Sequence, residues 1–336
     1  MRERPAKGET LKKRDGTAVK EQLGAIWRVF FPKRQKSTLT MWQQIKRAKS
    51  SYLLLAPYFI LFTIFTIIPV VAAIVLGFTY FNMLNVPKFI GLSNYEALFL
   101  NDEIFLLAIK NTIVFAVITG PIGYILCFIL AWFINDLPKP IRVFMTLVFY
   151  APSLSGNMYL IWQYIFSDDQ YGLVNSFLMT FLNIGIIDDP IKWFTDEKFV
   201  MTALIIVQLW LSLGAGFLAF MAGFKVVDRS IYEAGAIDGI RNRFQELVYL
   251  TLPSMKQQML FGAVMQISSA FAVGGISIAL AGFPSTNYSA HTIMTHIYDY
   301  GNVRYDMGYA CAVATVLLLI MLLVNKVIQS VLVEKD

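Results

Sequence analysis

The chain has 336 residues, of which 57% are hydrophobic and 15% are charged. Soluble domains have about 45–50% apolar and about 25% charged residues, so this composition excludes an ordinary soluble protein and indicates one membrane-embedded unit. The net charge of +6 does not indicate a nucleic-acid-binding protein, because residues 1–52 have a net charge of +10 and residues 53–336 one of −4. The excess positive charge therefore lies in a short N-terminal segment.

Residues 1–52 are predicted to form a basic cytoplasmic tail. Apolar side chains recur in it at helical spacing, which is typical of an amphipathic helix lying in the headgroup layer of a membrane. A disordered basic tail is the alternative interpretation. The apolar side chains are Leu23, Ile26, Trp27, Phe30 and Phe31.

Six uncharged stretches after the tail are long enough to cross a bilayer, since a spanning helix needs about 20 mostly apolar residues. A seventh uncharged stretch, residues 170–187, is interrupted by glycine, asparagine and glutamine, and we expect an outside loop there with an amphipathic piece on the surface. The predicted spans are residues 53–80, 111–134, 143–166, 199–224, 259–282 and 308–330.

The distribution of Lys and Arg orients these spans. Six spans with both termini in the cytoplasm place 23 basic residues inside and 5 outside. A seventh span would move the five basic residues of segment 225–257 to the outside, against the positive-inside rule. The sequence therefore predicts an all-α, multi-pass membrane protein with six transmembrane helices, its transmembrane domain covering residues 53–336.

Segment 225–256, between the fourth and fifth spans, is too long to be a simple connector, which needs only about 2–8 residues. Asp228 and Ser230 are cap-type residues, and Glu233 has the spacing of a capping box with Ser230. Gly239 can end that helix in a left-handed conformation. A second short helix with an apolar stripe is expected to follow, formed by Phe244, Leu247 and Val248 and stopped by Pro253.

The run Glu233-Ala234-Gly235-x3-Gly239, closing on Leu250-Thr251-Leu252-Pro253, resembles the EAA motif of the permeases of binding-protein-dependent ABC importers. The resemblance covers roughly residues 53–333 and is to the carbohydrate branch, typified by the maltose permease. Further similar stretches are Gly91-Leu92-Ser93-Asn94-Tyr95, Asn111-Thr112, Tyr150-Ala151-Pro152 to Trp162, Gly172-Leu173-Val174-Asn175, Ile237-Asp238-Gly239 and Tyr298 to Gly308-Tyr309-Ala310.

This resemblance implies the type I ABC importer permease fold, with a cytoplasmic coupling helix between spans four and five, in the bacterial cytoplasmic membrane. The implied partners are two ABC ATPase subunits, which bind ATP and Mg, a second homologous permease and an extracytoplasmic solute-binding protein that delivers a carbohydrate. The chain itself has no cofactor and no nucleic-acid partner in this interpretation. The implied ATPase-docking residues are Glu233, Ala234, Gly235, Ala236, Asp238, Gly239 and Arg241.

Two features of the motif depart from the family. Gly235 stands where the consensus has alanine, which keeps the position small but loosens the helix by about 0.5–1 kcal/mol. The interval between Gly239 and Leu250 has ten residues instead of the consensus nine. One extra residue is expected to rotate the second short helix by about 100° relative to the first.

The chain is not expected to be an enzyme. It has no G-x-x-x-x-G-K-[ST] phosphate-binding loop. Apart from Lys326 near the end of the sixth, the six predicted spans contain no Asp, Glu, Lys, Arg or His, which argues against ion coupling. A passive sugar or ion channel, or a membrane scaffold or sensor, remains the alternative to an importer subunit.

Polar uncharged and aromatic residues within the spans are candidates for contacts to a neutral, hydroxyl-rich solute such as an oligosaccharide. They can equally join helices to one another, and Trp162 can be an interfacial anchor. The candidates are Asn157, Trp162, Gln163, Gln208, Trp210, Gln266, Ser268 and Ser269.

Other tempting features are discounted or left open. His291 and His296 do not have metal-ligand spacing, and Cys127 and Cys311 lie in apolar stretches, so neither a metal site nor a disulfide is expected. Gly274 and Gly275 can mark a hinge or a close helix crossing. The acidic outside loop can dock a binding protein or simply be depleted of positive charge; its residues are Asp168, Asp169, Asp188, Asp189, Asp196 and Glu197.

Overall fold

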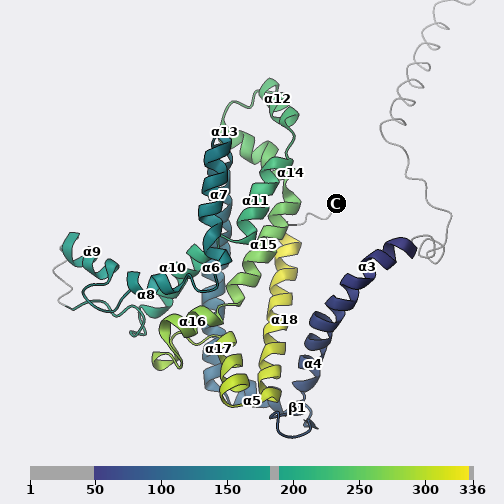
Figure 1. The fold of residues 1–336 in the computed structure, drawn as a ribbon, viewed down its shortest axis with the longest axis vertical. Helices are drawn as coiled ribbons and strands as arrows, with labels where there is room; N and C mark the ends of the chain where they lie inside the picture. Colours follow the sequence, from purple (N-terminus) through teal and green to yellow (C-terminus); the bar gives the residue numbers. More distant parts are fainter. Residues whose placement is uncertain (1–48, 182–188, 333–336) are drawn as a thin grey trace, which may run out of the picture. The chain divides into compact units, whose positions relative to one another are not determined.

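The structure is a computed structural model that describes residues 49–181 and 189–332 and is mainly helical (Figure 1). The predicted amphipathic helix of the tail lies outside these residues. The chain divides after Ile67 into two compact units. The first unit contains α3 (Lys49–Phe62) and a π-helix, η1 (Thr63–Ile67), and neither has a buried residue.

The second unit begins with α4 (Ile68–Leu76) and a short hairpin. Its strands, β1 (Thr79–Tyr80) and β2 (Lys88–Phe89), are antiparallel, with Thr79 opposite Phe89. The elements that follow are α5 (Ser93–Leu100), α6 (Glu103–Asn135), α7 (Lys139–Leu154), α8 (Leu160–Ile165), α9 (Leu173–Phe181), α10 (Val200–Leu211), α11 (Ala215–Val226), α12 (Arg229–Ile237), α13 (Arg243–Gln245), η2 (Glu246–Thr251), α14 (Leu252–Ser254), α15 (Lys256–Phe271), α16 (Gly274–Ala281), η3 (Thr286–Tyr288), α17 (Ile293–Tyr298), η4 (Asp299–Val303) and α18 (Met307–Leu332).

Four stretches of the described chain are long and apolar enough to cross a membrane, and a bent pair of helices makes a fifth. The bent pair is α15 and α16, whose axes differ by 41°. The total of six spans therefore stays a prediction. The four stretches are Lys49–Leu76, Glu103–Asn135, Val200–Val226 and Met307–Ser330.

The third predicted span, residues 143–166, is divided between two helices. Helix α7 ends at Leu154, Ser155 is extended, and α8 has only six residues. The last turn of α7 contains Pro152, and Ser155 and Gly156 follow it directly, residues that are poor for a helix interior. The apolar composition of this stretch therefore does not produce one unbroken helix, and the third span stays a prediction.

Other predicted boundaries shift for identifiable reasons. Helix α6 begins at Glu103, eight residues before the predicted span, because Asp102 accepts a hydrogen bond from the Phe105 amide and caps it. Lys110 interrupts the apolar stretch but not the helix. The interrupted stretch 170–187 contains α9, a nine-residue helix, where an amphipathic piece was expected. Residues 182–188 lie outside the described chain.

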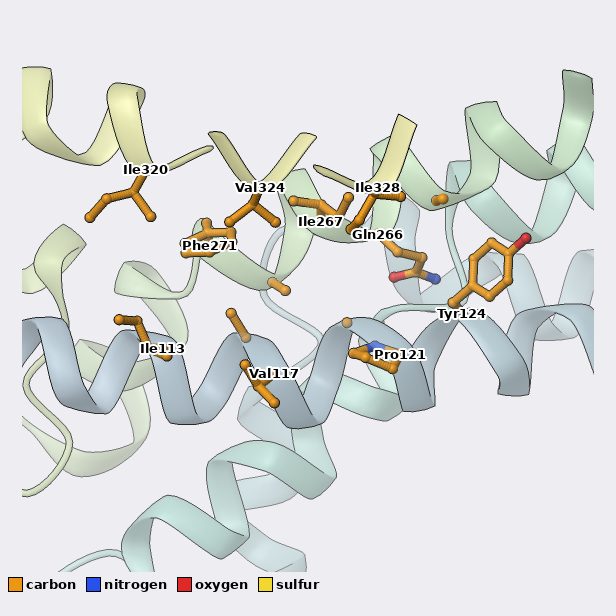
Figure 2. Close-up of a pocket in the computed structure, with 14 residues that line it drawn as sticks. Ile113, Val117, Pro121, Tyr124, Gln266, Ile267, Phe271, Ile320, Val324 and Ile328 are labelled. Atoms are coloured by element: carbon orange, nitrogen blue, oxygen red, sulfur yellow. The ribbon is translucent and has the colours of Figure 1, made fainter. Parts of the chain in front are cut away.

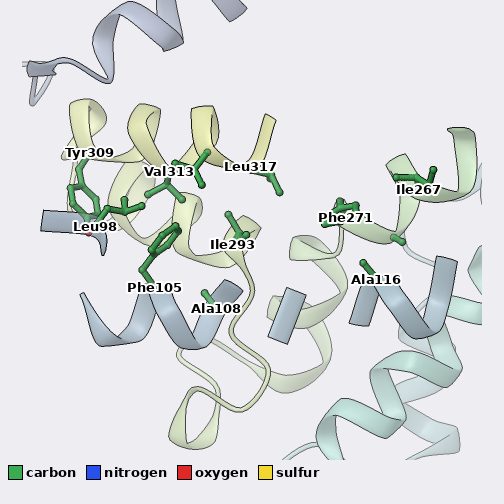
Figure 3. Packing of buried hydrophobic residues seen from close by; sticks show 12 residues of the cluster. Leu98, Phe105, Ala108, Ala116, Ile267, Phe271, Ile293, Tyr309, Val313 and Leu317 are labelled. Carbon is green, nitrogen blue, oxygen red and sulfur yellow. The ribbon is translucent and has the colours of Figure 1, made fainter. Parts of the chain in front are cut away.

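Helices α12 and α13 lie at one end of the second unit, here called the coupling-loop end (Figure 1). The β1–β2 hairpin, α5 and α17 lie at the opposite end, here called the hairpin end. One apolar cluster at the hairpin end joins α6, α17 and α18 through Phe105, Ile293 and Val313, as Figure 3 shows. A different cluster, around Phe217 and Phe220, joins the second half of α6 to α11.

Several residues hold loops in place, and they belong to the stretches that resemble the importer permeases. The Asn111 amide donates to the carbonyls of Tyr288, Ser289 and His291, and the Thr112 hydroxyl accepts from the Ile293 amide. These bonds attach the loop before α17 to α6, although the two segments are far apart in sequence.

Asn94 and Asn175 act in the same way. The Asn94 amide donates to two carbonyls in the turn between α4 and β1. The Asn175 amide donates to three loop carbonyls, and its oxygen accepts from the Trp193 indole at 2.9 Å. Gly308 lies so close to the Thr79 carbonyl that a side chain there would collide with it. Asn94, Asn175 and Gly308 therefore have structural roles: the asparagines hold loops, and the glycine allows close packing.

A buried polar cluster lies at the hairpin end. His296 Nε2 is 3.2 Å from Asp102 Oδ2, and His296 Nδ1 is 3.1 Å from His291 Nε2. The Tyr309 hydroxyl donates to Asp102 at 2.7 Å and the Tyr300 hydroxyl at 3.3 Å. The nearby Arg304 pairs with Asp299 at 2.7 Å. No group of three metal-ligating side chains occurs in the described chain.

Burial sets the protonation of this cluster. Burial, together with the neighbouring His296, lowers the pKa of His291 from 6.5 to about 4. Burial also lowers the pKa of His296, against the attraction of Asp102. Burial tends to raise the pKa of Asp102, but hydrogen bonds from Phe105 and Tyr309 and the nearby His296 hold it below its usual value. At neutral pH the cluster therefore contains a carboxylate and two neutral imidazoles.

We predict that acid destabilises the protein through His291. The folded chain keeps this imidazole neutral down to about pH 4, whereas in the unfolded chain it is protonated below its ordinary pKa of 6.5. The unfolded chain therefore binds more protons between these two values, so stability falls as the pH falls through that window, by at most about 3 kcal/mol.

The measurement is the melting temperature of the purified protein between pH 7 and pH 4. His291→Gln, which does not titrate, should be less stable than the wild type at pH 7, and the difference should narrow towards pH 4. Parallel pH profiles for the two proteins would contradict the prediction.

Candidate functional site

A polar cavity of about 510 Å³ lies where three helices of the described chain are interrupted. The end of α7 reaches it through Ser155 and Gly156, and the break between α10 and α11 through Ser212 and Gly214. The break between α15 and α16 reaches it at Ala272. Interrupted helices expose backbone polar groups at membrane depth, which is tolerated where they line a cavity.

Three of the eight predicted substrate residues line this cavity: Gln208, Gln266 and Ser269. The Gln208 amide donates to the Ser269 hydroxyl at 3.0 Å, which joins α10 to α15. Gln208 and Gln266 are each only 4% exposed. The structure thus brings together residues from two predicted spans.

The other five predicted residues lie elsewhere. The Gln163 amide donates to the Ala279 carbonyl, and the Ser268 hydroxyl donates to the Val264 carbonyl of its own helix. The Asn157 side chain accepts from the Tyr159 hydroxyl. None of these five residues lines the polar cavity.

The two tryptophans among these five residues belong to an aromatic group. The rings of Trp162 and Trp210 meet edge to face at 5.5 Å, and Trp162 also stacks on Phe166. The group packs against the buried cluster around Phe166 and Trp193. Helix packing therefore accounts for both predicted tryptophans.

Sequence reasoning missed most of the cavity wall. The missed polar residues are Ser153, Ser155, Tyr159 and Ser212, which come from two places where small residues interrupt an apolar stretch. Those interruptions, Pro-Ser-Leu-Ser-Gly at 152–156 and Ser-Leu-Gly-Ala-Gly at 212–216, were the available signal. The predicted hinge at Gly274 and Gly275 falls on such a break, and Gly274 also packs closely on Met294.

A second cavity of about 510 Å³ is almost entirely apolar and lies between α6, α15 and α18 (Figure 2). Its wall includes Val117 and Pro121 of α6 and Val324 of α18. Gln266 lines both cavities, so the polar cavity and the apolar one share this wall of α15.

The acidic outside loop uses several carboxylates for its own structure. Asp168 accepts from the Phe194 amide and the Thr195 hydroxyl, and Asp169 accepts from the Gly172 amide. Of the six predicted acidic residues, Asp188 lies outside the described chain. Charge depletion and partner docking both remain compatible with the loop.

Helix α12 of the coupling loop is fixed at both ends by local hydrogen bonds. The Asp228 carboxylate accepts from the Ser230 amide, so Asp228 is the N-cap. The predicted capping box of Ser230 and Glu233 is not formed, because Glu233 pairs with Arg229 at 3.4 Å on the exposed surface. Such an exposed ion pair contributes little to stability.

The C-terminal end of α12 is as predicted. Gly239 has a positive φ of 92°, and its amide donates to the Ala236 carbonyl. The Ile240 amide reaches back to the Gly235 carbonyl, which completes a Schellman motif. Gly235 is buried against Leu250, so it packs on the second half of the loop.

The extra residue of the coupling loop falls in a π-helix, η2 (Glu246–Thr251). A π-turn contains one residue more than the matching α-turn, so it absorbs an insertion locally. The Thr251 hydroxyl donates to the Glu246 carbonyl across this turn and meets the Tyr232 hydroxyl of α12 at 2.9 Å. The two halves of the loop are thereby held together.

The outer surface of the coupling loop combines small, charged and apolar side chains. Ala234, Ala236, Asp238 and Arg241 are exposed, as predicted for docking residues. Sequence reasoning missed Ile237, whose side chain is 87% exposed.

Comparison with known proteins supports this geometry. No protein-family model matches the chain. The chain is 30% identical over 285 residues to the probable ABC transporter permease protein YesP of Bacillus subtilis, covering 83% of this chain and 89% of YesP. It is 28% identical over 84% of its length to the arabinooligosaccharides transport system permease protein AraP of the same organism, covering 89% of AraP.

Two solved structures share the fold. One is a bacterial ABC transporter that imports the acidic polysaccharide alginate, with a TM-score of 0.65, 26% identity and coverage of 85% of this chain and 97% of the matched one. The other shows a bacterial alginate transporter in complex with a pentasaccharide-bound periplasmic protein, with a TM-score of 0.67, 24% identity and coverage of 86% and 97%. With 30% identity to YesP over 83% of its length, this chain belongs to the permease family of ABC transporters.

Proposed function

We propose that this permease is the membrane-spanning subunit of an importer that moves a carbohydrate, specifically an oligosaccharide, into the cytoplasm. The observation that carries the proposal is the polar, uncharged cavity at the three helix interruptions. Hydroxyl, amide and backbone groups line it, and these groups suit the hydroxyls of a sugar. The arabinooligosaccharide relative and the alginate importer support the same substrate class.

The mechanism that we infer is alternating access. A second, homologous permease completes the pathway, and an extracytoplasmic binding protein delivers the sugar to the hairpin end. Two ATPase subunits bind ATP and Mg and move the coupling loop as they close. Since α11 runs from the polar cavity to α12, a displacement of the loop acts on the cavity wall through one helix.

The chemistry of the cavity favours a neutral sugar. Its described wall contains no Asp, Glu, Lys, Arg or His. A carboxylate or phosphate group entering a site at membrane depth loses hydration, and this loss is costly without an opposing charge. The substrate is therefore distinguished from alginate, which the structural relative imports as an acidic polysaccharide.

Neither alternative accounts for both features. A passive channel has no use for a coupling loop with two bonded halves and an exposed apolar side chain. A scaffold or sensor has no use for a polar cavity at membrane depth. The importer subunit explains the cavity and the loop together.

Two adjacent serines test the cavity. Ser269 lines it, whereas the neighbouring Ser268 bonds to its own helix and does not. Ser269→Ala should raise the KM for uptake about fivefold, the effect of one lost hydrogen bond of about 1 kcal/mol, and Ser268→Ala should leave it unchanged.

The assay is uptake by cells that produce the complete importer, with labelled lactose and arabinotriose as neutral probes and an alginate trisaccharide as the anionic probe. We expect uptake of a neutral probe and none of the alginate trisaccharide. Selective uptake of the anionic probe would overturn the neutral-sugar assignment.

The coupling loop is tested by Ile237→Ser, Glu233→Lys and Gly239→Val. The first two change the exposed docking surface, and the third places a β-branched residue at a positive φ. Each should lower ATP-dependent uptake by about tenfold or more, the effect expected when an interface anchor is lost. The protein should remain in the membrane.

The control for copurification of the ATPase subunits is Leu84→Ser, which makes a comparable change at a residue that is 89% exposed on the opposite, hairpin end, away from the docking surface. Copurification of the ATPase subunits is the second measurement. Normal uptake and normal copurification in Ile237→Ser would exclude the docking role of that residue.

A further inference from the structure

The break in the fourth predicted span leaves one backbone carbonyl without its helical partner. Helix α10 ends at Leu211 and α11 begins at Ala215, so the Ser212 carbonyl does not bond to the amide four residues later. A carbonyl without a partner at membrane depth costs several kcal/mol. Its replacement partners therefore decide whether the break is stable.

Three donors converge on the Ser212 carbonyl oxygen. The Gly214 amide lies at 2.8 Å, the Gln266 amide nitrogen at 3.0 Å and the Cys127 sulfur at 3.4 Å. The Gln266 nitrogen also donates to the Cys127 sulfur at 2.8 Å. Both hydrogens of the glutamine amide and the thiol hydrogen thus have a partner within this group.

The three residues come from α6, from α15 and from the break between α10 and α11, and all three are buried. Cys127 of α6 is fully buried, Gln266 of α15 is 4% exposed and Ser212 is 6% exposed. Gly123 lets α6 approach the break, because a Cβ atom there would lie 3.0 Å from the Ser212 hydroxyl oxygen. The contact is therefore a built junction of α6, α15 and the break.

We propose that Cys127 and Gln266 form a clasp that holds the broken span against α6 and α15 and so fixes the shape of the polar cavity. Both are positioning residues for transport. The Gln266 amide nitrogen is then occupied by the protein and is not a sugar ligand. This inference rests on the proposed function, because the clasp has a role in transport only if the chain is an importer subunit.

Two connections link the clasp to function. The Ser212 amide donates to the Gln208 carbonyl at 2.8 Å, so a shift of Ser212 displaces the cavity residue Gln208 and its bond to Ser269. On the other side of the break, α11 continues to the coupling loop. The clasp therefore lies on the path between the ATPase-docking surface and the cavity.

The first test is a double-mutant cycle with Cys127→Ala and Gln266→Met, measured as the melting temperature of the purified chain. Methionine keeps the length of the side chain and removes the amide. If the two residues act as a unit, the double variant should be about as stable as Gln266→Met alone. Additive losses would show that no clasp exists, whatever the chain transports.

The second test is ATP turnover of the importer assembled with its own subunits in nanodiscs, a measurement that needs no identified sugar. Cys127→Ala and Gln266→Met should change turnover in the same direction, by about threefold to tenfold, and the double variant should match Gln266→Met. Cys127→Ser, which keeps a donor and an acceptor, should restore most of the wild-type rate.

Cys311→Ala is the matched control, because Cys311 is a half-buried thiol of α18 outside the clasp. Wild-type turnover in Cys127→Ala beside altered turnover in Gln266→Met would overturn the positioning role, since Gln266 would then act alone. If the wild-type chain supports no ATP turnover, the proposed function fails, and the melting-temperature cycle still decides the clasp.

Discussion

The hydrogen-bonding demand of backbone inside a membrane is the constraint on which this structure depends. A continuous helix satisfies that demand within itself, but α10 and α11 are separated by a break, as are α15 and α16. At the first break, one carbonyl is served by a backbone amide, a glutamine amide and a thiol. The polar cavity exists because these breaks are stable, and its wall is made largely of the residues beside them.

Irregular backbone in the loops makes a similar demand, and three asparagines meet it. Asn94, Asn111 and Asn175 each donate to two or three carbonyls of irregular backbone. One amide thus replaces the bonds that a helix or sheet would have supplied. These residues belong to stretches that resemble the carbohydrate branch of the family, and their role in this structure is to hold loops.

The sequence was sufficient to predict the helical class, most of the apolar helices and the left-handed Gly239, because those features depend on local composition and on one backbone angle. The sequence was not sufficient to predict where the helices are interrupted. Apolar content over 143–166 is compatible with a span, and only the three-dimensional surroundings of Pro152 and Ser155 show that the helix ends there. Whether a polar residue faces the cavity or a neighbouring helix also depends on its position around the helix axis. For this reason Ser269 lines the cavity and the adjacent Ser268 does not.

The π-helix Glu246–Thr251 has a consequence for how the family motif is recognised. The number of residues between the two halves of the motif does not fix the distance between those halves. A π-turn is wider than an α-turn, so it can contain an additional residue where the loop rejoins the helix bundle. We therefore expect a one-residue insertion to be tolerated at this position and to disturb α12, which is a regular α-helix. Divergent permeases are better aligned on the glycine and the proline separately than on the interval that joins them.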